Sequence, residues 1–328
     1  MFADIAKPIA PYLERDDVYD FCINSPGEVF YSTPSGWRHH ANELITQEWC
    51  ERLVTAISNA AVQKTDKTSP LLSTELVTGE RIQIVVPGAV NHVSVTIRRP
   101  NRSYLTLDHY QERGLLRTDR VTSNAGNSNV ETAKRLYDEG KVYECLAHCV
   151  DTRLNIMFSG STGSGKTTIA NTIGALIPER ERIITIEDAA EMRLTQPNQV
   201  NLFYPRNEKN PAVTADDLLA SCLRMAPDRI IFGELRGAEA FFYVDQINTG
   251  HAGSITTIHA NTAEKALKRL VKLIKRSVEG QGFHNDEILD DVRDEVHVIF
   301  QWHQHGLDHA YFPPLEATTD VRGPRLVA

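Results

Sequence analysis

The first third of the chain has the hydrophobic spacing of short strands and flanking helices. Alternating or continuous apolar runs predict strands at 18–23, 28–31, 81–86 and 92–97. Between the first two runs, residues 24–27 (Asn-Ser-Pro-Gly) form a turn sequence, in which the proline presets φ and the glycine allows a positive φ. Residues 47–62 carry apolar side chains at helical spacing. Because strands follow strands here, we expect a small antiparallel sheet with flanking helices.

From about residue 150 the pattern changes to short apolar runs that alternate with longer amphipathic segments. Strands are expected at 155–159, 182–186, 229–232 and 254–258. Helices are expected at 166–177, 214–225, 238–248 and 262–276. Such alternation is typical of an α/β domain with a mostly parallel sheet, covered by helices on both faces. Ligands of such sheets bind beyond the carboxyl ends of the strands, so candidate chemistry should follow directly after a strand.

A polar stretch separates the two patterns. Residues 118–129 (TDRVTSNAGNSN) are rich in Ser, Asn and Gly and have neither a helical nor a strand period. We therefore expect a smaller α+β domain at 1–117, a linker at 118–129 and the α/β domain at 130–328.

Composition and charge narrow the class of protein. A length of 328 residues suits two domains, and 41% hydrophobic with 24% charged residues excludes a disordered, collagenous or coiled-coil chain. The formal net charge of −8 is opposite to that of a general nucleic-acid coat, so no nucleic-acid specificity is expected. No run approaches 18 apolar residues, which predicts a cytoplasmic protein without a membrane span.

Residues 160–167 match the phosphate-binding pattern G-x-x-x-x-G-K-[ST] at every fixed position. In chain order they are Gly160, Ser161, Thr162, Gly163, Ser164, Gly165, Lys166 and Thr167. The glycines allow backbone N–H groups to surround an anion, and the following helix presents its positive end to it. Lys166 is then expected to reach the β- and γ-phosphates and the Thr167 hydroxyl to bind Mg²⁺. Thr168, the next residue, joins the nucleotide-binding candidates.

Two further predicted strands end in acidic residues. Glu187 and Asp188 follow 182–186, and Glu234 comes two residues after 229–232. Both ends belong to the edge where a nucleotide's Mg²⁺ and the attacking water would lie. One carboxylate could orient or deprotonate water while the other acts through the metal, with Glu234 as the metal-side candidate, directly or through water. Asp188 fits the capping of a helix equally well.

Two histidines flank the strand predicted at 254–258. His259, at its carboxyl end, is a candidate for sensing the γ-phosphate or placing water, with a purely structural histidine as an equal alternative. His251 precedes the strand, at the edge away from the nucleotide, and is expected to be structural or interfacial.

Four motifs in this order resemble those of the secretion-superfamily traffic ATPases, and are most similar to the VirB-operon ATPases of type IV secretion systems. They are the phosphate loop, ITIED (184–188), LRMAPDRIIFGELRGAEA (223–240) and TGHAGSITTIHAN (249–261). The resemblance is strong over about residues 150–300, and continues weakly through INSPGEV (23–29) and TIRRP (96–100).

The resemblance implies a fold, an activity and partners. The fold would be a RecA-like P-loop ATPase domain preceded by a PAS-like N-terminal domain, assembled as a homohexameric ring. The ligands would be ATP and Mg²⁺, and hydrolysis would drive substrate export and pilus biogenesis at the cytoplasmic face of the inner membrane. Partners would be inner-membrane components of the secretion system, including another secretion ATPase.

The resemblance also implies roles for individual residues. Glu187 would be the acid of the family's Asp box and Glu234 part of its Walker B motif, while His251 and His259 would form its His box. Arg98, at the end of TIRRP, matches an arginine of the N-terminal domain that reaches the γ-phosphate. Arg236 is a second candidate for contact with the nucleotide or a neighbouring subunit.

Other functions share parts of this pattern. ATPases of tight-adherence pili share RMxPDRII and HxGSxTTxHAN, although they usually have a longer N-terminal region and often Cys where Leu235 stands. A RecA-like DNA translocase would be expected to carry a basic groove interleaved with aromatic residues, which is absent here. A small-molecule kinase would leave Glu234 and His259 unexplained, and an inactive relative would bind ATP without turnover.

A basic amphipathic helix is predicted directly after the histidine strand. Residues 264–276 (EKALKRLVKLIKR) place apolar side chains at i, i+3, i+4 and i+7 and six cations on the remaining positions. This pattern is typical of a helix packed on the core with a solvated basic face. It would also suit attraction to an acidic phospholipid surface or to an acidic neighbour in a ring.

Overall fold

The chain forms two compact units, which are described separately. The computed structural model describes residues 5–76, 78–100, 106–112, 114, 116, 125–206, 208, 211–248 and 250–314. One unit comprises Met1–Gly126 with Ser221–Ala226, and the other Asn127–Ala220 with Pro227–Ala328. Helix α5 begins at Ala125, so residues 125–129 of the expected linker are helical, and residues 118–124 lie outside the described part of the chain.

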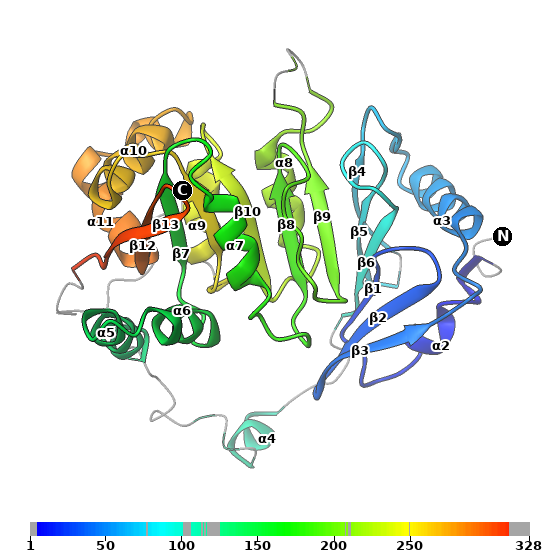
Figure 1. Cartoon of the computed structure of the whole chain (residues 1–328). Coiled ribbons are helices and arrows are strands. Elements are labelled where there is room, and N and C mark those ends of the chain that lie inside the picture. Colours follow the sequence, from blue (N-terminus) through cyan, green and yellow to red (C-terminus); the bar gives the residue numbers. More distant parts are fainter. Residues whose placement is uncertain are drawn as a thin grey trace. The chain divides into compact units, whose positions relative to one another are not determined.

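The first unit is built on a six-stranded antiparallel sheet in the order β3-β2-β1-β6-β5-β4 (Figure 1). Its strands are β1 (Asp20–Ile23), β2 (Glu28–Thr33), β3 (Gly36–Ala41), β4 (Leu71–Glu75), β5 (Arg81–Val85) and β6 (Ser94–Arg98). The antiparallel sheet expected from the sequence is therefore present. The edge strands β3 and β4 were not expected, because polar residues interrupt the apolar pattern there.

Helices α2 (Ala10–Leu13) and α3 (Gln47–Ala60) complete the core of this unit, whereas a third helix, α4 (Leu107–Glu112), has exposed side chains such as Leu107 and contributes no described residue to the core cluster. Thr46 caps α3 by accepting a hydrogen bond from the backbone N–H of Trp49 at 3.1 Å. The apolar stripe of α3, including Trp49, Leu53 and Ile57, packs on buried strand residues in one hydrophobic cluster.

The second unit is an α/β structure with a seven-stranded sheet in the order β13-β12-β7-β11-β10-β8-β9. Six neighbouring strands are parallel, and only the edge strand β13 is antiparallel. The strands are β7 (Ile156–Gly160), β8 (Ile183–Glu187), β9 (Gln199–Phe203), β10 (Arg229–Leu235), β11 (Ile255–Ile258), β12 (Val298–His303) and β13 (Gly306–Tyr311). The predicted mostly parallel α/β fold is confirmed. Strands β9, β12 and β13 were not expected from the sequence.

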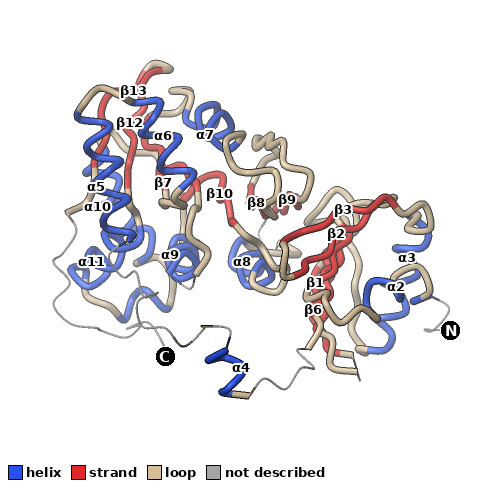
Figure 2. Tube along the Cα trace, turned by 90° about the horizontal axis from the view of Figure 1, so that it is seen from below, coloured by secondary structure: helices blue, strands red, loops and turns tan. Residues whose placement is uncertain are grey.

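Helices cover both faces of this sheet. They are α5 (Ala125–Asp138), α6 (Val142–Asp151), α7 (Lys166–Gly174), α8 (Ala215–Cys222), α9 (Ala240–Asn248), α10 (Ala263–Ile274) and α11 (Asn285–Glu295), with the 3₁₀-helix η2 (Glu279–Gly282). Figure 2 shows α6 and α7 on one side of the strand layer, with α8, α9 and α11 on the other. The central strands read as nearly continuous apolar runs because both of their faces are buried.

Asn155 ties together the beginnings of three parallel strands. It precedes β7, and its side-chain oxygen accepts hydrogen bonds from the backbone N–H groups of Gly253 and Ser254, which precede β11, at 2.9 and 3.0 Å. Its backbone N–H donates to Nδ1 of His297, which precedes β12, at 2.8 Å. Its side-chain amide donates to the carbonyl of Glu295 at 2.8 Å. These bonds satisfy buried backbone groups at the amino edge and set the starting points of the strands.

We expect His297→Asn to flatten the dependence of stability on pH. Burial lowers the pKa of His297 to about 4, so on acidification the unfolded chain takes up this proton before the folded chain does. Between about pH 6.5 and pH 4 the folded state therefore loses up to about 1.4 kcal/mol of unfolding free energy per pH unit. Asparagine keeps an acceptor near the Nδ1 position but does not titrate.

Urea unfolding of both proteins at several pH values in this window measures the effect. Burial raises the pKa of Glu295 to about 7, which gives a slope of the opposite sign. Because Glu295 is present in both proteins, the difference between their slopes isolates His297. Identical slopes would contradict the assignment.

Candidate functional site

The predicted phosphate loop lies between a buried strand and a helix. Strand β7 ends at Gly160 and α7 begins at Lys166, the order that the motif requires. Gly163 and Gly165 have φ values of +73° and +95°, a region that L-residues with a side chain rarely adopt. The loop therefore turns tightly enough to direct its backbone towards an anion at the start of α7.

The hairpin formed by β12 and β13 packs directly against the phosphate loop. The backbone N–H of His305, at the tip of this hairpin, donates to the carbonyl of Ser164 at 3.0 Å. A Cβ on Gly165 would lie 3.0 Å from Nδ1 of His305 and 3.3 Å from Nε1 of Trp302. Both tip residues, Gln304 and His305, have positive φ, at +46° and +64°. The close approach of this hairpin is thus a second reason for glycine in the loop, besides the expected binding of an anion.

Lys166 is buried and directed inwards. Its side chain is 5% exposed, and Nζ donates to the carbonyl of Ser161 at 2.8 Å. Nζ also lies 3.3 Å from Nδ1 of His259. Burial lowers the pKa of the Lys166 ammonium, while the nearby Glu234 carboxylate acts in the opposite direction. This ammonium is a preformed cation in a partly dehydrated position next to the loop.

His259 connects Lys166 to Glu234. Its Nε2 lies 3.0 Å from Oε1 of Glu234, on the neighbouring strand β10. Burial lowers the pKa of His259, and the Glu234 carboxylate only partly offsets this. The neutral imidazole then donates from Nε2 to Glu234 and accepts at Nδ1 from Lys166. Because Nδ1 is also 3.1 Å from the carbonyl of Gly160, protonation would exchange the contact with Lys166 for a bond to the loop.

Arg236 neutralises two of the acids at this edge. Its guanidinium donates to Glu234 at 2.6 Å and to Oδ2 of Asp188 at 3.0 Å. The hydrogen bond that Arg236 donates to Glu234 is the main cause of a raised pKa for Arg236. Arg206 donates to the same oxygen of Asp188 at 3.3 Å. Arg236, expected to contact the nucleotide or a neighbouring subunit, is thus engaged by acids of its own unit.

Glu187 is buried at the end of β8 and holds the following segment. Its carboxylate is 2% exposed and accepts hydrogen bonds from the backbone N–H groups of Glu191 and Met192, at 2.8 and 2.7 Å, and from the Thr185 hydroxyl at 2.9 Å. Burial nevertheless raises the pKa of Glu187. The carboxylate therefore acts on the segment after β8 rather than on the open side of the loop.

The acid that contacts Thr167 is Glu191. The Thr167 hydroxyl, predicted as a Mg²⁺ ligand, donates to Oε2 of Glu191 at 3.1 Å. Asn171 on α7 holds the same segment by donating to the carbonyl of Glu191 at 3.0 Å. Sequence analysis missed Glu191 because it follows no strand directly. The sequence offered one indication of its role. Glu191 is an acidic residue four positions after Glu187, in the segment whose backbone Glu187 holds.

The remaining loop candidates differ in exposure, since Ser164 is buried. Ser161, Thr162 and Gly163 are exposed, and Thr168 is exposed on the first turn of α7. His251 lies before β11, at the amino edge of the sheet and away from the loop, as expected.

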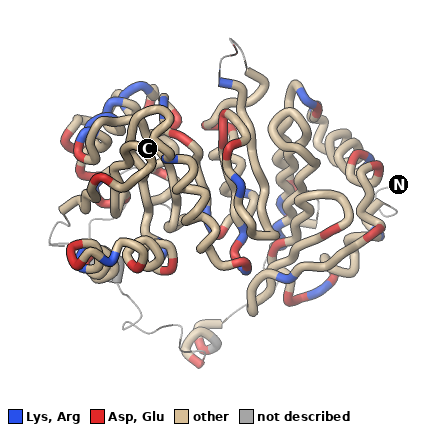
Figure 3. Tube along the Cα trace, viewed as in Figure 1, with Lys and Arg blue, Asp and Glu red and all other residues tan. Residues whose placement is uncertain are grey.

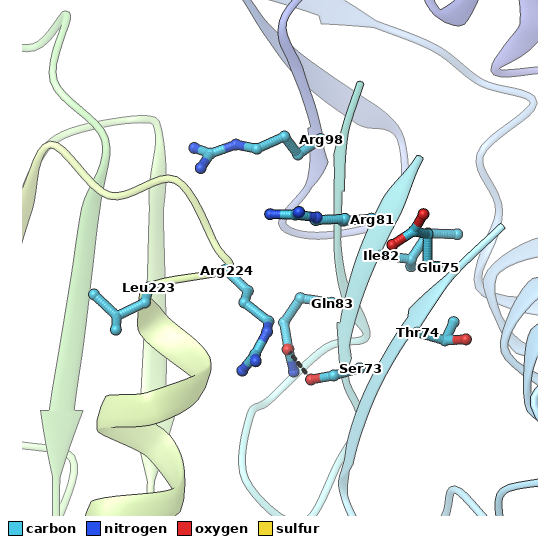
Figure 4. A pocket seen from close by; sticks show the side chains of 9 residues that line it. All are labelled: Ser73, Thr74, Glu75, Arg81, Ile82, Gln83, Arg98, Leu223 and Arg224. Atoms are coloured by element: carbon cyan, nitrogen blue, oxygen red, sulfur yellow. Dashed lines mark hydrogen bonds between the residues drawn. The ribbon is translucent and has the colours of Figure 1, made fainter. Parts of the chain in front are cut away.

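Arg98 ends β6 of the first unit. Its Nε donates to Oδ1 of Asp20 at 2.7 Å, and the β1–β6 register places these two residues opposite each other. It also borders a cavity of about 340 Å³ (Figure 4). There Arg81 and Arg98 extend to the same side of the sheet, and the Ser73 hydroxyl donates to the side chain of Gln83. Arg98 is thus a half-exposed cation in an arginine-rich recess.

The basic helix predicted after the histidine strand is α10. Thr262 caps it, and its apolar face, with Leu267, Leu270 and Ile274, is buried as a core-packed helix requires. Figure 3 shows Lys and Arg gathered along this helix. Part of its basic face lines a cavity of about 660 Å³ that the phosphate loop also lines.

The sequence and structure are similar to those of known secretion proteins. Residues 50–291 match the family described as "Type II/IV secretion system protein". The type IV secretion system protein VirB11 of Brucella suis is 38% identical over 281 residues, 84% of this chain and 78% of its own. VirB11 of Bartonella henselae is 34% identical over 309 residues, covering 90% and 87%. The crystal structure of the B. suis VirB11 ATPase in complex with sulphate superposes with a TM-score of 0.88 at 33% identity, covering 94% of each chain.

We expect Gly160→Ala to destabilise the protein by about 1–3 kcal/mol, because the new methyl group would overpack the loop against the hairpin. Its Cβ would lie 2.7 Å from Oγ of Ser164 and closer still to the carbonyl oxygen of Trp302. Gly282→Ala is the matched control, since its Cβ would meet nothing within 4 Å, and it should stay within about 0.5 kcal/mol of wild type. Denaturant unfolding compares the free energies of unfolding of the two variants. Equal values would show that the hairpin moves to accommodate the methyl group, which would contradict the prediction.

Proposed function

The chain belongs to the type II/IV secretion system protein family, among the VirB11-like ATPases of type IV secretion systems, and we propose that it hydrolyses Mg-ATP to power substrate export and pilus assembly. The observation that carries this proposal is the contact series from Lys166 through His259 to Glu234 beside the phosphate loop. It connects a cation placed to bind phosphate, Lys166, to a carboxylate able to accept a proton from water, Glu234. Hydrolysis rather than binding alone is therefore the proposed activity.

The phosphate groups of ATP would lie on the loop 160–165 and the first turn of α7. Backbone N–H groups and the helix N-terminus favour negative charge there. Lys166 would release the carbonyl of Ser161 and turn its ammonium to the β- and γ-phosphates. The solved relative's sulphate, an anion similar to phosphate in shape and charge, supports anion binding by this fold.

Glu234 is the proposed general base or water-orienting group. In the structure its carboxylate is shared between Arg236 and His259, which fix its position. His259 is neutral because burial lowers its pKa. It would respond to changes at the loop through its contact with Lys166. Such a group, oriented by a third residue, has the geometry expected for activation of a water molecule.

The residues near Thr167 fit a magnesium ion. The Thr167 hydroxyl and the Glu191 carboxylate are oxygen donors held 3.1 Å apart, and oxygen is the ligand type that Mg²⁺ prefers. Bound Mg²⁺ would neutralise charge on the β- and γ-phosphates. Glu187 would serve as a positioning residue, since its hydrogen bonds set the backbone that carries Glu191. Glu234 remains the candidate for a metal contact through water.

Movement of the N-terminal domain would couple hydrolysis to work in a homohexameric ring. Arg98 is the proposed link, because a cation from one domain that contacts the γ-phosphate bound to another makes domain position depend on hydrolysis. Its pairing with Asp20 leaves the guanidinium about half exposed, and therefore available to a phosphate.

The proposed place of action is the cytoplasmic face of the inner membrane, among components of the secretion system that include a second secretion ATPase. Within the described part of the chain, no helix has the length and hydrophobicity to span a bilayer. The basic face of α10 would suit attraction to acidic phospholipid.

Replacement of the loop lysine tests the activity itself. We expect Lys166→Ala to lower the rate of Mg-ATP hydrolysis by about 10²–10³-fold, because the cation that stabilises the transferred phosphoryl group is lost. Lys134→Ala, on the exposed face of α5, removes the same charge elsewhere and should leave the rate unchanged. Phosphate release measured for the two variants and wild type decides the case, and undiminished turnover in Lys166→Ala would refute the proposed site.

Glu191→Gln tests the metal side of the site. It should raise the Mg²⁺ concentration needed for half-maximal ATPase activity by about tenfold, because a charged oxygen near Thr167 becomes neutral. Glu187→Gln should instead lower stability, since its buried carboxylate accepts two backbone hydrogen bonds. Magnesium titrations and thermal unfolding of both variants separate the two roles. An unchanged Mg²⁺ requirement in Glu191→Gln would remove Glu191 from the metal site.

A further inference from the structure

A cationic cavity adjoins the phosphate loop on the side of α10. It has a volume of about 660 Å³ and is lined by Ser161 and His259 on the loop side. Its other side consists of the four α10 cations Lys265, Lys268, Arg269 and Lys272. These follow the spacing i, i+3, i+4 and i+7, so they share one helix face and extend over roughly 10 Å of its length.

None of the four cations forms an ion pair within the part of the chain that the structure describes, although Asp286 lines a neighbouring cavity together with Lys268 and Lys272. None of their side chains forms an ion pair or a hydrogen bond with another described residue. The last two cations of the same segment behave differently. The Lys275 ammonium donates to the carbonyls of Gln281 and Phe283, and Arg276 donates to the carbonyl of Arg236. The two cations outside the cavity are therefore held by backbone carbonyls, whereas the four that line the cavity remain available to bind a ligand.

Like charges on one helix face repel one another, and an anion between them removes this repulsion. The residues that line the cavity include four cations and no carboxylate, so the cavity suits an anion rather than a cation. Its four cations are exposed side chains that border a space large enough for an anion, next to the loop where phosphate groups are expected to bind. This points to a small oxyanion as the occupant.

We propose that the cavity is a second anion site, which binds inorganic phosphate next to the nucleotide site. It rests on the proposed function in one respect, because ATP hydrolysis at the loop supplies the phosphate. Phosphate freed at the γ-position would lie next to the cations of α10, because the phosphate loop and these cations line the same cavity. His259 borders both places, because it contacts Lys166 and also lines the cavity.

If the nucleotide site and the phosphate site are separate, ADP and phosphate are bound at the same time. Phosphate should therefore bind to the chain when Mg-ADP already saturates the loop. Added phosphate should also inhibit ATP hydrolysis in a way that excess ATP does not fully reverse. A single shared site would make inhibition by phosphate purely competitive.

Equilibrium dialysis of radiolabelled inorganic phosphate against the full chain with saturating Mg-ADP, at about physiological ionic strength, tests the proposal directly. The informative variant is Lys268→Ala/Lys272→Ala. The control is Lys134→Ala/Lys141→Ala, which removes the same charge from exposed residues paired with Asp138 and Glu139. We expect wild type and control to bind phosphate equally and the cavity variant at least about tenfold more weakly, because two charged donors are lost. The KM for ATP should change by less than about twofold.

Several results would overturn the proposal. They are the absence of phosphate binding to the ADP-saturated wild type, equal binding by the cavity variant and the control, and a rise in the KM for ATP as large as the loss of phosphate affinity. A change in the mass of the cavity variant in solution, with phosphate binding intact, would instead mark this face as a contact between copies. Circular dichroism establishes that the variants fold.

The nucleotide-free chain separates failure of the proposal from failure of the proposed function. Lys166→Ala should lose ATP hydrolysis yet keep the phosphate binding that depends on Lys268 and Lys272. If wild type hydrolysed no ATP but kept this binding, the proposed function would fail and the anion site would stand. Loss of phosphate binding in Lys166→Ala would assign the anion to the loop and refute the second site.

Discussion

Lys166, His259 and Glu234 meet because β7, β11 and β10 are parallel neighbours in a defined register. Ile258 pairs with Ser159 of β7 on one side and with Leu235 of β10 on the other. The residues next to these pairs, Gly160, His259 and Glu234, therefore reach the same edge. The pairing of β10 with β11 already contains an irregularity between Phe232 and Leu235, but a slip of one residue between β7 and β11 would turn each side chain to the opposite face of the sheet. The hydrogen bonds of Asn155 at the amino edge resist such a slip, so a structural asparagine at one edge supports the chemistry at the other.

The electrostatics of this edge depend on pairing within the same unit. Arg236 holds Glu234 and Asp188, and His259 stays neutral between a cation and a carboxylate. Partly buried charges of this kind are stable only when their partners are in place. A nucleotide that draws Lys166 away from His259 would therefore change the surroundings of Glu234 as well. Binding of phosphate groups would thus be linked, through the His259 imidazole, to the surroundings of the proposed base, Glu234.

The sequence predicted those features that depend on local pattern. The phosphate loop, the strand ends before Glu187 and Glu234, and the core-packed helix after His259 all follow from spacing along the chain. What it could not predict depends on contacts between distant segments. The β12–β13 hairpin supports the phosphate loop from more than a hundred residues away, and its apolar run ends in polar residues that obscure its pattern. Glu191 became a candidate only because Glu187, a residue assigned to catalysis from the sequence, turns out to anchor the backbone that carries it.

Helix α10 begins shortly after His259, a residue of the proposed nucleotide site. Its cap, Thr262, is three residues beyond His259, so little slack separates the imidazole from the first cation, Lys265. The buried face of α10 fixes the helix on α9 and α11, which leaves its basic face with a rigid base. Because this row of cations is rigid, its own geometry does not change with the state of the neighbouring loop. It can respond to the loop only through an anion bound between them. The net charge of −8 thus conceals a local excess of positive charge, and that excess borders the cavity beside the phosphate loop.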